Sequence, residues 1–495
     1  MSTPSRPRAR PASSPHSGPS HSADHRQPPG LPAARVTAAR SSEPTRAAAS
    51  RPSPHTPRLA QPTSLLLPAR SPSVTRTSHL LGLAISLALA ATTTTGCSPF
   101  GAEQDEPVAL SVRASATDRS AMDAVVAEFH RLNPDTHVTV DYSDTGDLQQ
   151  ELPGELRAGD GPDVFTVWPG NGNPASVTAL EHDDLLENLS LRRFNLTMPI
   201  GVKPVTDVNH STFAVPVTFS GIGAVFSMGE LDAIGGAPPR TWTELLTLCD
   251  KARDHGKVLL ALGNGTPWVT QLITYALVAT TVYADEPDFD SDMELGKETF
   301  ANSGWRTALR KYMEMDGRGC FNADALDTTY EETLDQVVTG RAVGVVQVAS
   351  VLSELRAAAP GLTLRMAALP ATDDPDDTRM PGAVSAAYGL NPGTPHRKEA
   401  LAFIDFLGSA RGQNLYNRFG ATLPAIPNAS FTVDPAIREV AERQKAGTTV
   451  PFMDQRWPNS AVQQTHFAQV EALFAGTTDV EAALAALDKA YEERT

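Results

Sequence analysis

The sequence predicts a mixed α/β fold, and three features support this prediction. From Val108 onward, short apolar segments typical of strands alternate with segments whose apolar residues recur at helical spacing. The strand–helix–strand order indicates a parallel sheet with crossover helices. No internal repeat or long linker interrupts this pattern. We therefore expect two α/β lobes, each a mixed sheet flanked by helices, that share one compact unit.

The first elements follow the alternation closely. Residues 108–115 alternate like a half-buried strand, and the next segment places Met122, Val125 and Phe129 on one helical face before Asn133 and Pro134 end it. The expected elements are strand 108–115, helix 118–132, strand 137–143, helix 148–158 with Pro153 inside it, and strand 162–168.

The later chain continues in the same way. Thr241 and Glu244 form a capping-box pattern that opens a helix, and Thr478 and Glu481 repeat this pattern before the last helix. The expected strands are 213–219, 221–227, 258–263, 341–348 and 363–369, and the expected helices are 241–252, 268–278, 305–315, 398–407 and one after Thr478.

Length, composition and charge exclude several classes of protein. The chain has 495 residues, 41% of them apolar, and three cysteines, so it is neither a disulfide-framework miniprotein nor, for lack of an apolar run of about 18 residues, a polytopic membrane protein. Residues 1–96 hold 11 Arg, no Lys and two acids, so the remaining chain carries 30 basic and 55 acidic residues, a net charge of −25. Such a body repels nucleic acid and anionic lipid.

The N-terminal 77 residues form a separate compositional region. They contain 15 of the 40 prolines, with abundant Ser, Ala and Arg and no periodicity. We expect residues 1–77 to be a disordered extension, because this composition cannot bury enough apolar surface to offset chain entropy. One alternative is a basic arm that touches an anionic polymer, and another is that synthesis begins further downstream, near Val74.

Residues 78–97 have the organisation of an export signal. Arg70 and Arg76 precede a 12-residue apolar core, Leu80–Ala91, which is too short to span a bilayer. The small residues up to Gly96, followed by Cys97, resemble the lipobox of bacterial lipoproteins, although Thr94 stands where an aliphatic residue is usual. The resemblance implies lipid attachment at Cys97, a tether at 98–107, and an extracytoplasmic protein anchored to the bacterial cell membrane. Ordinary cleavage beside a bystander cysteine is the alternative.

Export leaves Cys249 and Cys320 as the two thiols of the body in an oxidising compartment. We expect one disulfide between them, with two separately buried thiols as the alternative.

Nine segments, in chain order, resemble extracellular solute-binding proteins of carbohydrate ABC importers, the family that includes maltose-binding protein. They include LRAGDGPDVFTVWPGNG, FAVPVTFSGIGAVFSMGEL, PRTWTELLTLCDKA and SAAYGLNPGTPHRKEALAFIDFL. The resemblance implies a type II periplasmic-binding-protein-like fold with a ligand cleft between two lobes. It assigns 108–216 and 362–426 to the first lobe and 217–361 and 427–495 to the second. It also implies a monomer that binds a carbohydrate, docks on permease subunits and needs no cofactor.

Aromatic side chains are the first candidates for sugar contact, because sugars present apolar C–H faces. Trp168 follows a strand directly and matches an aromatic cleft position of the family, as does Trp268 on the opposite lobe. Trp457 stands in a polar loop, and Tyr388 lies on a strand that enters the cleft in the family. Core packing is the alternative for each, and we expect it for Trp242 and Trp305.

Polar candidates lie at strand ends. Asp118 and Asp144 follow the first two strands, where open α/β sheets bind ligands, although either could cap the next helix. Asn171 lies in the glycine-rich loop after Trp168, and Gln347 corresponds to a cleft-facing position of the family. Thr218 stands near the place of the family's acidic residue at the first crossing between the lobes, so the identity of the sugar stays open.

The sequence gives little support for an enzyme or for a metal-binding protein. It contains no HExxH, GxSxG, Walker or GxGxxG motif, and the acidic stretch 285–292 lacks EF-hand spacing. We expect neither catalysis nor a metal. A binding protein for another solute, such as a polyamine, and an exported carbohydrate-active enzyme remain the alternatives. The first needs carboxylates that converge around the aromatic residues, and the second needs a carboxylate pair about 5–10 Å apart.

Overall fold

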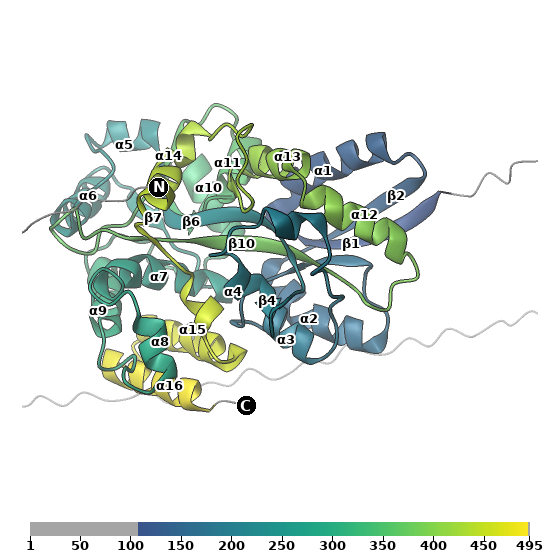
Figure 1. The fold of residues 1–495 in the computed structure, drawn as a ribbon. Helices are drawn as coiled ribbons and strands as arrows, with labels where there is room; N and C mark the ends of the chain where they lie inside the picture. The colour runs from purple at the N-terminus through teal and green to yellow at the C-terminus, as the bar shows by residue number, and fades with distance from the viewer. Residues whose placement is uncertain (1–106, 494–495) are drawn as a thin grey trace, which may run out of the picture. The chain divides into compact units, whose positions relative to one another are not determined.

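The computed structural model describes residues 107–493 (Figure 1). The expected extension 1–77, the signal segment 78–97 with Cys97, and the tether up to residue 106 lie outside the described residues. Among residues 107–493, no helix is long and apolar enough to cross a membrane.

The described chain is organised around one mixed sheet with the strand order β2-β1-β3-β10-β6-β8-β7. The β1/β2, β1/β3 and β7/β8 pairs are parallel, whereas β10 runs antiparallel to β3 and β6, and β6 runs antiparallel to β8. The strands of this sheet are β1 (Val108–Ser115), β2 (Thr136–Ser143), β3 (Val164–Val167), β6 (Val215–Ser227), β7 (Val258–Ala261), β8 (Ala342–Val348), β9 (Leu364–Ala367), β10 (Met380–Leu390), β11 (Leu423–Pro424) and β12 (Thr449–Val450); a separate hairpin pairs β4 (Asp207–Val208) with β5 (Ser211–Thr212).

Two long strands join the halves of the sheet. The first half of β6 pairs with β10 and β11, and its second half pairs with β8 and β9. Similarly, β10 begins beside β12 and ends beside β3. Figure 1 shows both strands running through the middle of the molecule. We call the half around β1, β2 and β3 the first lobe, and the half around β7 and β8 the second lobe.

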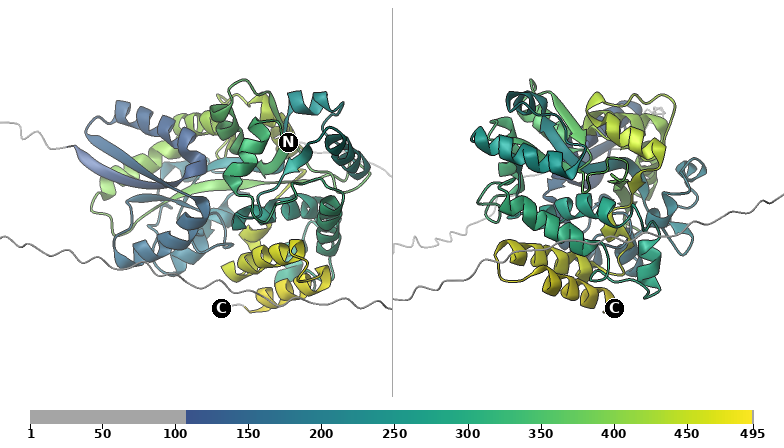
Figure 2. Two further views of the ribbon diagram at one scale, coloured as in Figure 1. Left: turned by 180° about the vertical axis from the view of Figure 1, so that it is seen from behind. Right: turned by 90° about the vertical axis from the view of Figure 1, so that its left-hand side faces the viewer.

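Each lobe has its own apolar interior. In the first lobe, α1, α12 and α13 cover one face of the sheet, and α2 and α3 cover the other (Figures 1 and 2). In the second lobe, α7 packs beneath the sheet, and α9, α15 and α16 form a further layer. The helices are α1 (Arg119–Leu132), α2 (Thr145–Ala158), α3 (Val177–His182), α4 (Lys203–Thr206), α5 (Met228–Ala233), α6 (Trp242–Asp254), α7 (Thr270–Thr281), α8 (Phe289–Glu294), α9 (Trp305–Gly317), α10 (Tyr330–Val338), α11 (Val351–Ala358), α12 (Arg397–Leu407), α13 (Ala410–Gly420), α14 (Arg438–Ala446), α15 (Ser460–Phe474) and α16 (Val480–Glu492).

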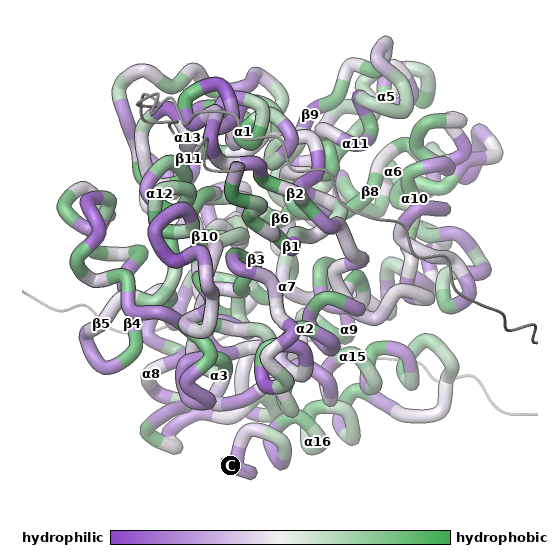
Figure 3. The backbone as a smooth tube through the Cα atoms, turned by 90° about the vertical axis from the view of Figure 1, so that its right-hand side faces the viewer, coloured by the Kyte–Doolittle hydropathy of each residue, from purple (hydrophilic) through white to green (hydrophobic). Residues whose placement is uncertain are grey.

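The hydropathy pattern explains this layering. In Figure 3 the strands in the interior are mostly hydrophobic, while many turns and helix faces at the periphery are hydrophilic. Every residue of β3 is buried, as a central strand covered by helices on both faces requires. By contrast, β1 alternates between buried and exposed side chains over most of its length.

Several local predictions differ from the structure. The two expected strands 213–219 and 221–227 are one continuous strand, β6, which begins at Val215 and runs through Gly221 without interruption. The expected capping residue Thr478 is replaced by Asp479, whose side chain accepts the N–H of Ala482. Residues 364–369, expected in the first lobe, pack in the interior of the second, because β9 pairs with the second half of β6.

A disulfide joins Cys249 on α6 to Cys320, which follows α9. It closes a loop across 71 positions inside the second lobe, and both cysteines are fully buried.

Candidate functional site

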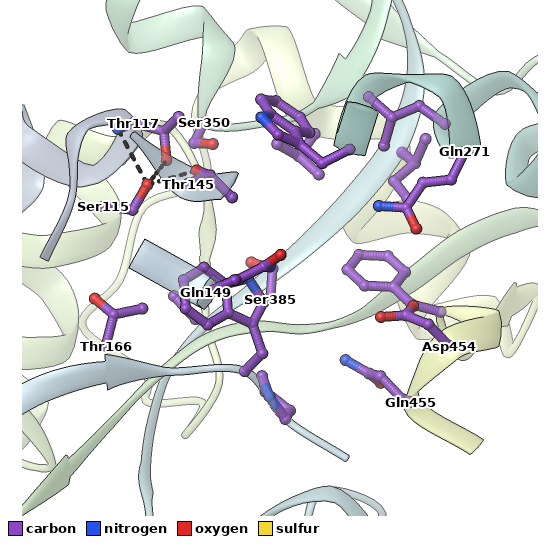
Figure 4. A pocket seen from close by; sticks show the side chains of 18 of the residues that line it. Ser115, Thr117, Thr145, Gln149, Thr166, Gln271, Ser350, Ser385, Asp454 and Gln455 are labelled. Atoms are coloured by element: carbon purple, nitrogen blue, oxygen red, sulfur yellow. Dashed lines mark hydrogen bonds between the residues drawn. The ribbon is translucent and has the colours of Figure 1, made fainter. Parts of the chain in front are cut away.

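A cavity of about 120 Å³ lies between the two lobes (Figure 4). Its wall combines polar side chains with aromatic rings, which is typical of small-molecule sites. The lining residues are Ser115, Thr117, Asp118, Thr145, Gln149, Thr166, Trp168, Pro169, Ile222, Trp268, Gln271, Leu272, Tyr275, Val348, Ser350, Ser385, Ala386, Phe452, Asp454, Gln455 and Gln463.

The wall from the first lobe is built at the carboxyl ends of β1 and β2. The hydroxyl of Ser115 lies 2.9 Å from that of Thr117 and 2.8 Å from that of Thr145, and Figure 4 shows the three side chains together. Asp118 follows them directly. It occupies the N-cap position of α1 but makes no side-chain capping bond, so its carboxylate remains available to the cavity.

The wall from the second lobe comes from the start of α7 and from α15. The ring of Trp268 packs on Tyr330 with centroids 5.1 Å apart. Gln463 donates through Nε2 to Oε1 of Gln271 at 3.1 Å and to Oδ2 of Asp454 at 3.3 Å. This network fixes the orientation of three polar side chains on one side of the cavity.

The floor is formed where β6 and β10 pair side by side between the lobes. The ladder between these strands is irregular on both sides of Ala386. Thr218 on β6 compensates for the irregularity: its hydroxyl lies 2.6 Å from that of Ser385 and accepts the N–H of Ala386 at 3.2 Å. Gln455 also binds here and donates to the carbonyl of Val384 at 2.7 Å.

The glycine-rich loop at 169–173 meets the second lobe at close range. Gly170 has a φ of +85°, and a Cβ added there would lie 2.4 Å from the carbonyl oxygen of Gln455. A Cβ on Gly172 would lie 2.5 Å from Cβ of Asp454. Glycine is therefore required at both positions for this approach. Asn171, between them, donates from Nδ2 to the carbonyl of Pro458 at 2.6 Å.

Two buried polar atoms on the cavity wall have no hydrogen-bond partner within the described chain. They are Nε1 of Trp268 and Oε1 of Gln463, and each residue is at most 7% exposed. An unpartnered buried polar atom costs about 1–3 kcal/mol, so a donor and an acceptor left open on one cavity favour a hydrogen-bonding ligand.

Two carboxyl groups give the cavity its charge. Burial raises the pKa of Asp118 to about 6, against a smaller opposing effect of a hydrogen bond from Tyr416. Burial likewise raises the pKa of Asp454 to about 6, opposed by hydrogen bonds from its backbone and from Tyr275. Behind Asp118, the hydroxyl of Tyr330 donates to Glu354 at 2.6 Å, and burial raises the pKa of Glu354 to about 7.

Three of the predicted ligand residues line the cavity: Trp168, Trp268 and Asp118. Trp168 is half-buried at the end of β3 and comes from the first lobe, whereas Trp268 is 7% exposed and comes from the second. The two tryptophans therefore reach the same cavity from opposite sides.

The other predicted ligand residues lie elsewhere for identifiable reasons. Asp144 caps α2 by accepting the N–H of Gly146 at 2.7 Å. Gln347 is fully buried in β8, and strand alternation presents its neighbour Val348 to the cavity instead.

Tyr388 faces the interior of the first lobe, with its hydroxyl 3.0 Å from that of Tyr416. Trp457 packs against Phe300, Trp305 and Tyr275 in the interior of the second lobe. Asn171 makes the contact between lobes described above.

The loop around Trp457 does reach the cavity, but through Asp454 and Gln455 and not through the predicted tryptophan. A short 3-10 helix at Met453–Arg456 turns Asp454 and Gln455 toward the cavity and Trp457 into the core. Gln149, Gln271 and Gln463 were missed altogether. Their only sequence signal is a glutamine in an otherwise amphipathic or apolar helix, which becomes informative once the helices are placed.

Within residues 107–493, no group of three or more acidic, His or Cys side chains is arranged to hold a metal ion.

Two lobes joined by continuous strands, with a cavity of polar and aromatic side chains between them, define a solute-binding protein with the type II architecture. The sequence comparison agrees: the chain belongs to the bacterial extracellular solute-binding protein family, whose profile matches residues 113–414. A search of curated proteins gives no match.

Solved structures share the fold at low sequence identity. One is a protein from work on xylan utilization by Caldanaerobius polysaccharolyticus, with a TM-score of 0.68, 16% identity, and coverage of 77% of this chain and 99% of that one. The GacH receptor of Streptomyces glaucescens, solved without ligand and with acarbose, has a TM-score of 0.64, 16% identity, and coverage of 79% and 100%. RafE in complex with raffinose has a TM-score of 0.63, 16% identity, and coverage of 77% and 98%.

Proposed function

We propose that this protein is the lipid-anchored, extracytoplasmic carbohydrate receptor of an ABC importer. It captures a mono- or oligosaccharide in the cavity between its lobes and delivers it to membrane permease subunits. We place the first lobe at about 108–216 and 384–426, joined to the second through β6 and β10. The solved relatives named with xylan, raffinose and acarbose support a carbohydrate ligand.

The observation that carries this proposal is the pair of unpartnered buried polar atoms, Nε1 of Trp268 and Oε1 of Gln463, on a cavity wall that also holds two tryptophans. Sugar hydroxyls both donate and accept, so one ligand can satisfy Nε1 of Trp268 and Oε1 of Gln463 together. The rings of Trp168 and Trp268 supply apolar faces for the sugar C–H groups. Micromolar affinity needs about −8 kcal/mol, which a few such hydrogen bonds and two stacked rings can provide.

A receptor binds its sugar without cleaving it, and this distinguishes the proposed function from that of a carbohydrate-active enzyme. Asp118 and Asp454 both line the cavity, so a carboxylate pair is present. We expect a bound oligosaccharide to be recovered intact after prolonged incubation with the protein. Release of shorter sugars, lost in Asp118→Asn, would contradict a receptor role.

The test of binding is a thermal-shift screen of neutral, amino and acidic saccharides on the purified protein, followed by calorimetry. A ligand that binds the folded form raises its melting temperature. We expect at least one saccharide to do so, and the shift to disappear in Trp268→Ala. A protein stabilised by polyamines or amino acids and by no saccharide would contradict the proposed ligand class.

Membrane attachment is tested separately through Cys97. We expect mass spectrometry of membrane-extracted protein to find an acylated N-terminal cysteine, and Cys97→Ala to move the protein to the soluble fraction. Retention of Cys97→Ala in the membrane would contradict lipid anchoring.

A further inference from the structure

The cavity carries negative charge on two sides and no positive charge. Among its 21 lining residues, Asp118 and Asp454 are the ionisable acids, and none is Lys, Arg or His. Asp118 belongs to the first lobe, and Asp454 belongs to the segment that packs in the second. A ligand between the lobes is therefore exposed to both carboxylates.

Neither carboxylate has a cationic partner in the described chain. The arginines beside them in sequence face other groups. The guanidinium carbon of Arg119 lies 4.0 Å from the centre of the Tyr142 ring. Arg456 is exposed, and its charge acts on Asp290. The hydrogen bonds to the two cavity carboxylates come from neutral groups, Tyr416 for Asp118, and Tyr275 and Gln463 for Asp454.

Asp118 and Asp454 are both partly buried, and removing an ionised carboxylate from water without a counter-ion is unfavourable. The raised pKa values of Asp118 and Asp454, about 6, still leave both groups largely ionised at pH 7. A neutral sugar can donate hydrogen bonds from its hydroxyl groups to these carboxylates, but it leaves their negative charge uncompensated. An acidic sugar adds repulsion, whereas an ammonium group compensates the charge directly.

Resting on the proposed carbohydrate function, we propose that the cavity selects a saccharide that carries a protonated amine, which Asp118 and Asp454 bind from opposite lobes. The rest of the wall distinguishes such a ligand from a linear polyamine. Nε1 of Trp268 can only donate and is unpartnered, so it needs an acceptor oxygen. A polyamine has none, whereas an amino sugar offers ring and hydroxyl oxygens beside its amine.

The experiment compares matched pairs of sugars that differ only at the amine. Glucosamine is paired with glucose, galactosamine with galactose, and fully deacetylated chitobiose with N,N′-diacetylchitobiose. Calorimetry at pH 7 and low salt should show at least about tenfold tighter binding of the amine form in at least one pair, which is about 1.4 kcal/mol. Added salt should narrow the difference, because it screens charge.

The carboxylates are tested by Asp118→Asn and Asp454→Asn. Each should lower the affinity for the amine form more than the affinity for its neutral partner, and so reduce the preference for the amine form. Asp316→Asn, which removes a partly buried carboxylate outside the cavity, should leave the preference intact. Urea melts confirm that each variant is folded.

The outcomes separate the two proposals. Equal or tighter binding of the neutral form in every pair that binds overturns the amine inference and leaves the carbohydrate receptor standing. Failure of all three amine forms to bind also overturns it. Binding of spermidine without any saccharide overturns both.

Discussion

Gly172 in the first lobe lies so close to Asp454 that a Cβ on the glycine would come within 2.5 Å of Cβ and 2.6 Å of the carbonyl oxygen of Asp454. The glycine-rich loop thus touches the same residue whose carboxylate lines the cavity. Loop position and cavity charge are therefore physically linked.

The first prediction tests this contact. In Gly172→Ala, the added methyl group must push the loop away from Asp454, because backbone atoms stand in its path. Overpacking of this kind costs about 1–3 kcal/mol, so we expect sugar affinity to fall roughly 5- to 150-fold. Calorimetry measures the change. Gly154→Ala, where no atom lies within 4 Å of the new methyl group, is the control and should keep full affinity.

The second prediction concerns Trp268. Trp268→Ala should cost about 2–4 kcal/mol of binding, roughly 30- to 1000-fold in affinity, by analogy with aromatic hot spots. Trp268→Phe keeps a ring against Tyr330 but removes the unpartnered Nε1 donor, so its loss should be smaller, about 0.5–1.5 kcal/mol. Trp305→Phe, fully buried away from the cavity, should lower stability and leave affinity unchanged. Undiminished binding by Trp268→Ala would mean that the sugar lies elsewhere.

The third prediction is a pH dependence of stability. Because burial raises the pKa of Asp454 from 3.8 to about 6, the folded state binds more protons than the unfolded state between these values. The contribution of this group to the free energy of unfolding therefore falls as pH rises from about 4 to about 6, by about 1–3 kcal/mol. Urea melts should show Asp454→Asn gaining stability relative to the wild type over this range.

Glu481 provides a control of opposite sign. The side chains of Arg306 and Arg310 lower its pKa. Its stabilising contribution is present at neutral pH and is lost as pH falls, so Glu481→Gln should approach wild-type stability on acidification. A pH-independent difference between Asp454→Asn and the wild type would contradict the predicted shift.

The fourth prediction addresses the pairing of β6 with β10 at the floor of the cavity. Thr218→Val removes the hydroxyl that binds Ser385 and the N–H of Ala386. Thr218 is 2% exposed, so the freed groups have poor access to water and the free energy of unfolding should fall by about 1–3 kcal/mol. Thr218→Ser retains the hydroxyl and should lose less. Equal loss in both variants would assign the effect to packing of the methyl group.

The fifth prediction concerns the disulfide between Cys249 and Cys320. Closing a loop of 71 positions restricts the unfolded chain, and the chain-entropy relation gives about 4 kcal/mol. Reduction should lower the urea midpoint accordingly, and thiol titration of unreduced, denatured protein should find neither cysteine free. Two titratable thiols would mean that the bridge does not form.

The layout of this molecule is easier to predict from its sequence than the details of its cavity are. The alternation of strands and helices predicts the α/β fold, because helical and strand periods are local properties. The positions of Trp168 and Asp118 after strands, and of Trp268 in the turn before α7, are local as well. Gln271, Gln463 and Asp454 meet only through long-range packing, and the 3-10 turn that exchanges Asp454 for Trp457 at the cavity has no clear sequence signature.

The irregular ladder beside Ala386 has a mechanical consequence. The strands β6 and β10 tie the lobes together, so any relative rotation must bend them, and a ribbon bends most readily where its hydrogen-bond ladder is interrupted. That interruption forms the floor of the cavity, which Ser385 and Ala386 line. A solute bound at the proposed site would contact the two strands where they bend most readily, so it would restrict that bending directly, without a separate signal between distant parts of the protein.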